Sequence, residues 1–543
     1  MTRASVSCAV AAASATIISS LLVAAVLFIY VPIECDGTWY SYPAFAWSQG
    51  GDPSENIPGT KRFSPPPERP VARFSWENRS NLTVLITRLW FGLYTPSWVS
   101  LKLLGALQVL LLIALAGISV WLVTADRIAA LVAAALVLSD SRVLAAGLCD
   151  ARPDLFIAVF ALGLLITVWG AIERRNAFTL AGAIVLALLL ATLHATTANA
   201  IAFFLALLGV LELANPHRAA GASHRRGLTL LFAGLLVGAF FAKQPFLDLV
   251  IPTQVPLSAE TEYRHNAEDE LSKIIHNGLR AKATMEWVRW KEYFFAANIA
   301  QFSFVVAGLV AAVLLWRRRV ALPAATWAIA LTVAFPAAAL AMFAVDSHPI
   351  VQHAIVLAVL GYIGSAVAIA VANEVGIWSR AHTVVFIAIL LGLTALLKAG
   401  HFYKLYQQYV RPQISNPAEQ AALRSAIQVA GDVTIVGPAE IWPFLSDRRQ
   451  PLTLIDDTSA LYRDGDQRFR LDVDHADLGA VNYLVLNKRY YSAWHFDKAV
   501  AEWRAQGLIE QLSAVGDCDR TVECLQIYKL LPTTRQIEAP RAE

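Results

Sequence analysis

The chain has 543 residues, of which 57% are hydrophobic and 16% are charged, and its mean hydropathy is +0.52. A soluble protein normally carries about a quarter charged residues, so a large part of this chain is expected to face lipid. The formal net charge is only +3. Such a charge offers no strongly basic surface, which argues against nucleic-acid binding as a function class.

Long apolar runs dominate the first 400 residues. A helix needs about 20 apolar residues to cross the hydrocarbon core, where every backbone polar group must be paired internally. The chain contains about eleven such runs. They cover residues 10–32, 98–124, 128–148, 155–172, 178–193, 198–213, 228–246, 299–316, 322–345, 350–372 and 383–399. The sequence therefore predicts a multi-span α-helical membrane protein with about 11 transmembrane helices.

The basic residues between these runs predict the orientation. Dense clusters such as Arg174–Arg175, residues 217–226 and Arg317–Arg319 fall in alternate loops. Short loops rich in Lys and Arg stay on the cytoplasmic side. We therefore expect a cytoplasmic N-terminus in the inner membrane, and an odd number of spans then places the C-terminal part outside the cytoplasm.

This orientation divides the chain into two predicted domains. Residues 1–400 form the transmembrane domain, whose outer loops are 33–97, 147–154 and 247–298, and residues 401–543 form an extracytoplasmic α/β domain. Strands are expected at 432–437, 452–455, 483–486 and within 522–530, and a helix at 496–506, from their apolar patterns. Cys518 and Cys524 are close enough to form a disulfide in an oxidising compartment, and two reduced thiols are the alternative.

The first outer loop begins with carboxylates and aromatic rings. Glu34 and Asp36 follow the first span directly, and Trp39, Tyr40 and Tyr42 come next. A carboxylate at the membrane boundary could act as a general base on an acceptor hydroxyl, while the rings could stack on sugars. The structural alternative is that the rings belong to the interfacial aromatic belt and that Asp36 caps a helix.

The second outer loop places an arginine between two aspartates. Asp150, Arg152 and Asp154 lie together at the predicted start of the fourth span. Pro153 and Asp154 suit a helix start on structural grounds alone. Arg152 has no such explanation, and it could pair with Asp150 or bind a lipid phosphate through its planar guanidinium.

Further candidates lie near other predicted outer span ends. His348 and His353 could donate to phosphate oxygens, or His348 could simply line a turn. Lys243 is a weaker candidate of the same kind. Asp140 and Arg142 fall deep in the third span, where a charge costs about 3 kcal/mol, so they should face the protein interior or a wet cavity. No ligand motif supports a divalent metal, which stays open as a cofactor.

Several of these segments together resemble one family. Residues 36–44 and 50–53 resemble the acidic motif of the GT-C superfamily of polyprenyl-phosphate-sugar-dependent glycosyltransferases, which includes protein O-mannosyltransferases and aminoarabinose transferases. Residues 151–154 resemble the motif that opens the fourth span in many members, and 348–362 is similar to a segment that carries an Arg or His before an apolar helix. The tail, at 435–438 and 444–449, resembles the outer domain of bacterial members.

The resemblance implies an inverting sugar transfer at the outer membrane face. The donor would be a polyprenyl-phosphate-linked sugar, and the acceptor a lipid, glycan or protein of the cell envelope. Carried over to this chain, Asp36 is the base, Asp150 or Asp154 is the second acidic group, and Arg152, His348 and His353 contact the carrier phosphate. Many members have two adjacent acids in the first motif, whereas here Gly37 follows Asp36, so Glu34 stays an alternative base.

Two other classes of function remain open from the sequence. A transporter or flippase of lipid-linked sugars would share the many spans, but such proteins often contain internal repeats, and none is clear here. A non-catalytic envelope assembly protein would use its tail to bind a partner. Substitution of Asp36 would leave the function of such a protein intact.

Overall fold

The structure is a computed structural model. It describes residues 3–33, 81–150, 153–174, 227–236, 298–320, 355–427, 433–446, 452–456, 481–487, 496–516 and 524–531, together with shorter pieces between these ranges. The chain divides into two compact units. The helical unit comprises Met1–Ala24, Glu77–Thr83 and Leu104–His401, and the sheet unit comprises Ala25–Trp76, Val84–Leu103 and Phe402–Glu543.

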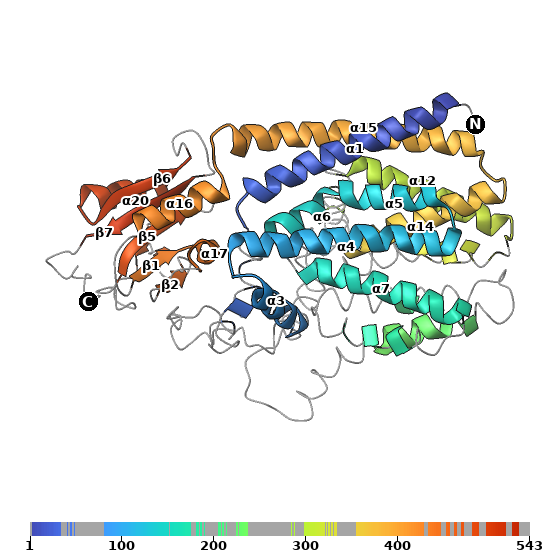
Figure 1. Cartoon of the computed structure of the whole chain (residues 1–543), viewed down its shortest axis with the longest axis horizontal. Helices are drawn as coiled ribbons and strands as arrows, with labels where there is room; N and C mark the ends of the chain where they lie inside the picture. Colours follow the sequence, from blue (N-terminus) through green and yellow to red (C-terminus); the bar gives the residue numbers. More distant parts are fainter. Residues whose placement is uncertain are drawn as a thin grey trace. The chain divides into compact units, whose positions relative to one another are not determined.

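Long apolar helices make up the helical unit (Figure 1). The main ones are α1 (Arg3–Ile29), α4 (Trp98–Thr124), α5 (Arg127–Ser139), α6 (Ser141–Ala145), α7 (Pro153–Arg174), α12 (Ile299–Arg317), α14 (Ile355–Glu374) and α15 (Arg380–Leu405). Within the described residues, five helices are long and apolar enough to cross a membrane, or six if α5 and α6 count as one span. The protein is thus a multi-pass membrane protein, and the predicted total of about eleven spans is not confirmed.

Helix α14 forms the centre of the helical unit. It packs against α5, α7 and α12, and all its residues from Ile355 to Ala372 are buried. Close approach to α12 depends on Gly308, where a Cβ atom would lie 2.2 Å from the Cβ of Ser365 in α14. Small residues at such crossings allow membrane helices to pack tightly.

The third predicted span is broken at Asp140. Helices α5 and α6 meet there at an angle of 57°. Asp140 has an extended backbone and caps both helices, since it follows the last turn of α5 and its side chain accepts a hydrogen bond from the backbone N–H of Arg142 in α6. The chain continues as the π-helix η2 (Ala146–Asp150), and α7 begins at Pro153. Much of the predicted outer loop 147–154 is therefore helical.

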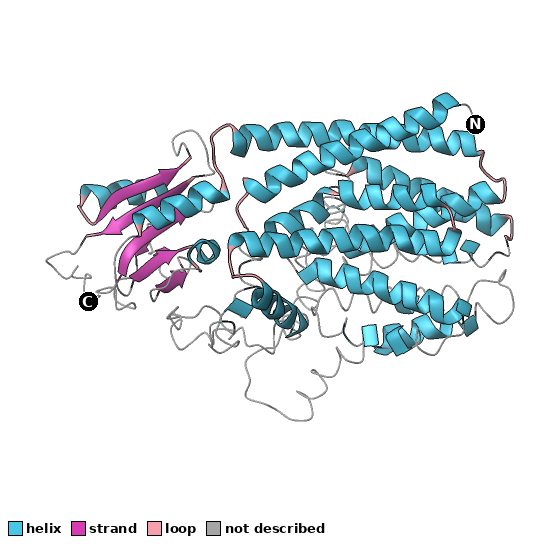
Figure 2. Ribbon diagram, in the orientation of Figure 1, coloured by secondary structure: helices cyan, strands magenta, loops and turns pink. Residues whose placement is uncertain are grey.

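Among the described residues, the strands lie in the C-terminal part of the chain (Figure 2). They are β1 (Val433–Gly437), β2 (Leu452–Asp456), β3 (Leu461–Arg463), β4 (Phe469–Leu471), β5 (Val481–Asn487), β6 (Ile509–Val515) and β7 (Leu525–Leu530). The main sheet has the order β2-β1-β5-β7-β6. Strand β1 pairs in parallel with β2 and β5, whereas β7 pairs antiparallel with β5 and β6.

The small α/β arrangement predicted for the tail is present. Strands β1, β2, β5 and β7 and helix α20 (Phe496–Ala505) lie where the apolar patterns placed them, whereas β6 and the β3–β4 hairpin were not expected. Cys524 is disulfide-bonded, but Cys518 lies outside the described residues, so the identity of the partner stays a prediction.

The core of the sheet unit draws on distant parts of the sequence. Strand residues such as Ile435 and Val485 pack in one buried cluster with α3 (Asn81–Leu93), the start of α4 and α16 (Asn416–Ala426). Ile33, which precedes Glu34 and Asp36, and Ala44, which follows them, belong to the same cluster. Residues on both sides of these two carboxylates are therefore part of the hydrophobic core of the sheet unit.

Candidate functional site

A buried lysine holds the end of the first helix. Lys102, in the first turns of α4, is only 1% exposed. Its ammonium group donates a hydrogen bond of 2.7 Å to the carbonyl oxygen of Leu27 and another to that of Val31. The last carbonyls of a helix lack intrahelical partners and carry partial negative charge, so a cation there is favourable. Lys102 thus fixes the turn after α1, where the predicted first outer loop begins.

Asn416 binds the same turn from another part of the chain. It is the first residue of α16, which Ser415 caps by accepting a hydrogen bond from the backbone N–H of Ala418. The fully buried Asn416 amide lies 3.3, 3.1 and 3.0 Å from the carbonyl oxygens of Phe28, Ile29 and Val31. The turn that leads to the predicted acidic motif is therefore held by two buried donors.

Trp442 holds the chain on the other side of Glu34 and Asp36. Its indole N–H donates a hydrogen bond of 3.3 Å to the carbonyl oxygen of Thr38, and its ring stacks on Phe45 with centroids 4.6 Å apart. Thr38 is fully buried and Ile33 is 1% exposed. In the sequence, Glu34 and Asp36 lie between these two buried residues. We call Lys102, Asn416 and Trp442 the loop clamp.

A second buried polar cluster lies in the helical unit. Asp140 and Arg142 form an ion pair with a 2.6 Å separation between Oδ2 and Nη2. Their side chains are 0% and 5% exposed. The expectation that both residues face the protein interior is confirmed. Removing one partner of such a pair is costly, because it leaves an uncompensated buried charge.

Residues of three other helices or their caps complete this cluster. The Tyr362 hydroxyl donates to Asp140 Oδ2 at 2.6 Å, and the Asn298 amide donates to Asp140 Oδ1 at 3.3 Å. Lys398, which is 2% exposed, binds the hydroxyl of Ser141. The described cluster thus contains two cationic side chains and one carboxylate. It fixes the break between α5 and α6, from which the chain leads to Asp150.

The predicted site residues themselves are not placed by the structure. Glu34, Asp36, Trp39, Tyr40, Tyr42, Arg152, Lys243, His348 and His353 lie outside the described residues. The backbones of Asp150 and Asp154 lie at the end of η2 and the start of α7, but their side chains are not described. Their convergence on one cavity therefore stays a prediction. Within the part of the chain that is described, no group of three or more His, Cys, Asp or Glu residues could hold a metal ion.

The structure adds residues that the sequence analysis did not single out. Lys102 and Lys398 each lie in an apolar helix, where an ionisable residue is a signal of a buried partner or a site. That signal was present in the sequence. Asn416 and Trp442 carry no such local signal, because their role depends on carbonyl groups several hundred residues away.

No family model matches the chain, and no curated protein matches it. Among solved structures, the chain is similar to ArnT from Cupriavidus metallidurans. The TM-score is 0.49 for the apo state and 0.46 for ArnT bound to undecaprenyl phosphate. Each comparison has 14% sequence identity and covers 94% of this chain and 96% of that chain. ArnT is an aminoarabinose transferase of the GT-C family, the family whose motifs the sequence resembles. At this distance, the likeness supplies no role for any residue.

Proposed function

We propose that this protein is a membrane glycosyltransferase that moves a sugar from a polyprenyl-phosphate carrier to a cell-envelope acceptor at the outer face of the inner membrane. The observation that carries the proposal is the loop clamp. Lys102 and Asn416 bind the turn before Glu34 and Asp36, and Trp442 binds Thr38 just after these two carboxylates. Pre-organised supports around a reactive group are what catalysis requires.

In this proposal, Asp36 takes the proton from the acceptor hydroxyl as its oxygen attacks the anomeric carbon. The bond between that carbon and the carrier phosphate oxygen breaks, its electron pair leaves with the phosphate, and the anomeric configuration inverts. Glu34 is the alternative base, and Asp150 and Asp154 are candidates for the second acidic group.

The remaining predicted residues take binding roles in the same proposal. Arg152, His348, His353 and Lys243 neutralise the carrier phosphate, because cationic and N–H donors form strong hydrogen bonds with phosphate oxygens. Trp39, Tyr40 and Tyr42 stack on the sugar. The aromatic and apolar character of the boundary suits a donor whose prenyl tail stays in the membrane.

The test uses the full-length protein in lipid nanodiscs with a radiolabelled undecaprenyl-phosphate sugar. Undecaprenyl phosphate is the carrier bound in one of the similar ArnT structures. General-base catalysis typically contributes about 10²–10⁴-fold, so Asp36→Asn should lower turnover by that order. Glu502→Gln, an exposed position in α20, is the matched control and should retain wild-type turnover.

The outcomes distinguish Asp36 from Glu34 as the general base, and a glycosyltransferase from a flippase. Wild-type turnover in Asp36→Asn would remove Asp36 as the base, and the same result for Glu34→Gln as well would remove the carboxylate mechanism in this loop. If the wild-type protein moves the labelled lipid between leaflets of a liposome without transferring the sugar, the protein is a flippase.

A further inference from the structure

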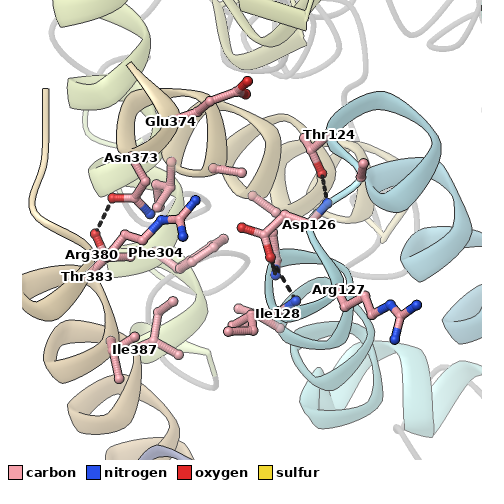
Figure 3. A pocket seen from close by; sticks show the side chains of 17 residues that line it. Thr124, Asp126, Arg127, Ile128, Phe304, Asn373, Glu374, Arg380, Thr383 and Ile387 are labelled. Atoms are coloured by element: carbon pink, nitrogen blue, oxygen red, sulfur yellow. Dashed lines mark hydrogen bonds between the residues drawn. The ribbon is translucent and has the colours of Figure 1, made fainter. Parts of the chain in front are cut away.

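A cavity of about 440 Å³ lies where four helices begin or end in the helical unit. Helix α4 ends at Thr124 and α5 begins at Arg127, while α14 ends at Glu374 and α15 begins at Arg380. Residues from all four helices line the cavity, and α12 contributes Phe304 (Figure 3). Because membrane helices end at the headgroup region, the cavity lies at one boundary of the bilayer.

The cavity has a polar rim and an apolar floor. The rim carries two arginines, two carboxylates, an amide and hydroxyl groups. Eight of the apolar lining side chains are buried and come from α5, α12, α14 and α15: Ala129, Val132, Phe304, Ala366, Ile369, Ala370, Val384 and Ile387. A ligand without an apolar part would make no contact with this apolar floor. A cavity with a polar rim and an apolar floor suits a lipid, which has a charged headgroup and apolar acyl chains.

Two opposite charges face the cavity without pairing. Figure 3 shows the side chains of Asp126 and Arg380 directed into the opening from opposite walls. Asp126 and Arg380 do not form an ion pair with each other. Oxygen Oδ1 of Asp126 accepts hydrogen bonds from the backbone N–H groups of Ile128 and Ala129 at 2.8 and 3.2 Å. Its other oxygen makes no hydrogen bond within the described part of the chain.

We propose that this cavity binds a zwitterionic aminophospholipid, with its phosphate against Arg380 and its primary ammonium against Asp126. A phosphate at this position also meets the first N–H groups of α15, which is where helices favour anions. Glu374 ends α14, where a cation is favoured, and it is one of the residues that line the cavity. The acyl chains begin on the apolar floor and continue along the helices.

Charge complementarity selects this class of lipid over others. Two cations, Arg127 and Arg380, and two anions, Asp126 and Glu374, are among the lining residues, so the formal charges cancel. The side chains of Asp126 and Arg380 are the two that face each other across the opening (Figure 3). An anionic lipid without an amine would leave the carboxylates uncompensated. A choline headgroup carries a positive charge but has no N–H to donate to a carboxylate, whereas an ethanolamine ammonium has three donors.

The test is native mass spectrometry of the full-length protein with matched-chain phosphatidylethanolamine, phosphatidylglycerol and phosphatidylcholine. Arg380→Gln removes the phosphate partner. Asp126→Asn removes the charge while keeping a residue that caps a helix equally well. Arg318→Gln is the control, since it makes the same charge change at a position that does not line the cavity.

We expect phosphatidylethanolamine to be retained selectively by the wild-type protein. Its binding should weaken on the order of tenfold in Arg380→Gln and in Asp126→Asn, because each variant removes a charge-assisted hydrogen bond at a partly exposed site. Arg318→Gln should bind like wild type. Thermal unfolding midpoints should agree among the three variants, which separates lost binding from lost folding.

Three results would overturn the proposal. Equal retention of phosphatidylglycerol or phosphatidylcholine would exclude headgroup selection by paired charges. An equal loss of phosphatidylethanolamine binding in Arg380→Gln and Arg318→Gln would indicate that binding depends on the total charge of the protein and not on this cavity. Competition by free phosphoethanolamine at the same concentration as the lipid would show that the apolar floor contributes nothing. None of these results depends on sugar transfer, so the proposed glycosyltransferase function is tested separately.

Discussion

The hydroxyl of Tyr362 in α14 donates a 2.6 Å hydrogen bond to Asp140, which lies 222 positions earlier in the chain. The same hydroxyl accepts a 3.1 Å hydrogen bond from the guanidinium of Arg142. One side chain thus connects the most buried helix to both members of the ion pair at the break between α5 and α6. The stability of this break therefore depends on contacts made across the helical unit.

Replacing Tyr362 with Phe should destabilise the protein. The ring packing is kept, but Asp140 loses a donor in a buried site, and a hydrogen bond to a charged group is worth about 1.5–3 kcal/mol. The unfolding midpoint of the purified protein in detergent should fall. Tyr403→Phe provides the control, because Tyr403 in α15 is 63% exposed and should leave the midpoint unchanged. An unchanged midpoint for Tyr362→Phe would show that the cluster does not depend on this hydroxyl.

Replacing Lys102 with Met should impair sugar transfer if the proposed function is correct. Methionine fills much of the space of the buried lysine stem but leaves the carbonyl oxygens of Leu27 and Val31 without their cationic donor. A small displacement of the following loop should lower turnover by about tenfold to a hundredfold. Turnover at saturating donor is measured beside the unfolding midpoint.

Lys404→Met is the control for this variant, since Lys404 is exposed near the end of α15. It should retain wild-type turnover. If Lys102→Met is as active as this control, the clamp at the start of the loop has no part in the chemistry.

Replacing Trp442 with Phe should loosen the segment that follows Asp36. Phenylalanine keeps an aromatic ring against Phe45 but removes the indole N–H that binds the carbonyl oxygen of Thr38. Hydrogen exchange measured by mass spectrometry should become faster in peptides that cover residues 34–48. Trp121→Phe, at a half-exposed position in α4, should leave those peptides unchanged. Equal exchange in both variants would refute the anchoring role of Trp442.

Replacing Gly308 with Ala should disturb the packing of α12 on α14. The new methyl group would lie 2.2 Å from the side chain of Ser365 and 2.5 Å from its Cα atom, so one of the helices must move. Overpacking of this kind costs about 1–3 kcal/mol, which should appear as a lower unfolding midpoint. Gly392→Ala meets nothing within 4 Å and should be neutral or slightly stabilising, because alanine favours a helix over glycine. If Gly308→Ala and Gly392→Ala have equal unfolding midpoints, the crossing of α12 and α14 accommodates the methyl group without loss of stability.

Much of the secondary structure could be predicted from local sequence, because helices and strands leave local patterns. The run 98–124 predicts α4 to the residue, and the apolar segments at 452–455 and 483–486 lie within β2 and β5. The break at Asp140 was not predicted, because the polar residues 139–142 fall within the run 128–148, which predicts a single span. The two buried charges within that run did predict an interior environment, which the ion pair confirms.

The sequence by itself determined that this chain enters the membrane and carries a small α/β tail. Helices and strands pair their backbone N–H and C=O groups regularly, and the spacing of apolar residues along the sequence indicates which of the two forms. Only the tertiary structure decided which side chains hold the chain on the two sides of Glu34 and Asp36. Trp442 binds Thr38 across 404 positions, and Asn416 binds Ile29 across 387. No local periodicity encodes such contacts, because they form only when distant elements pack into one core.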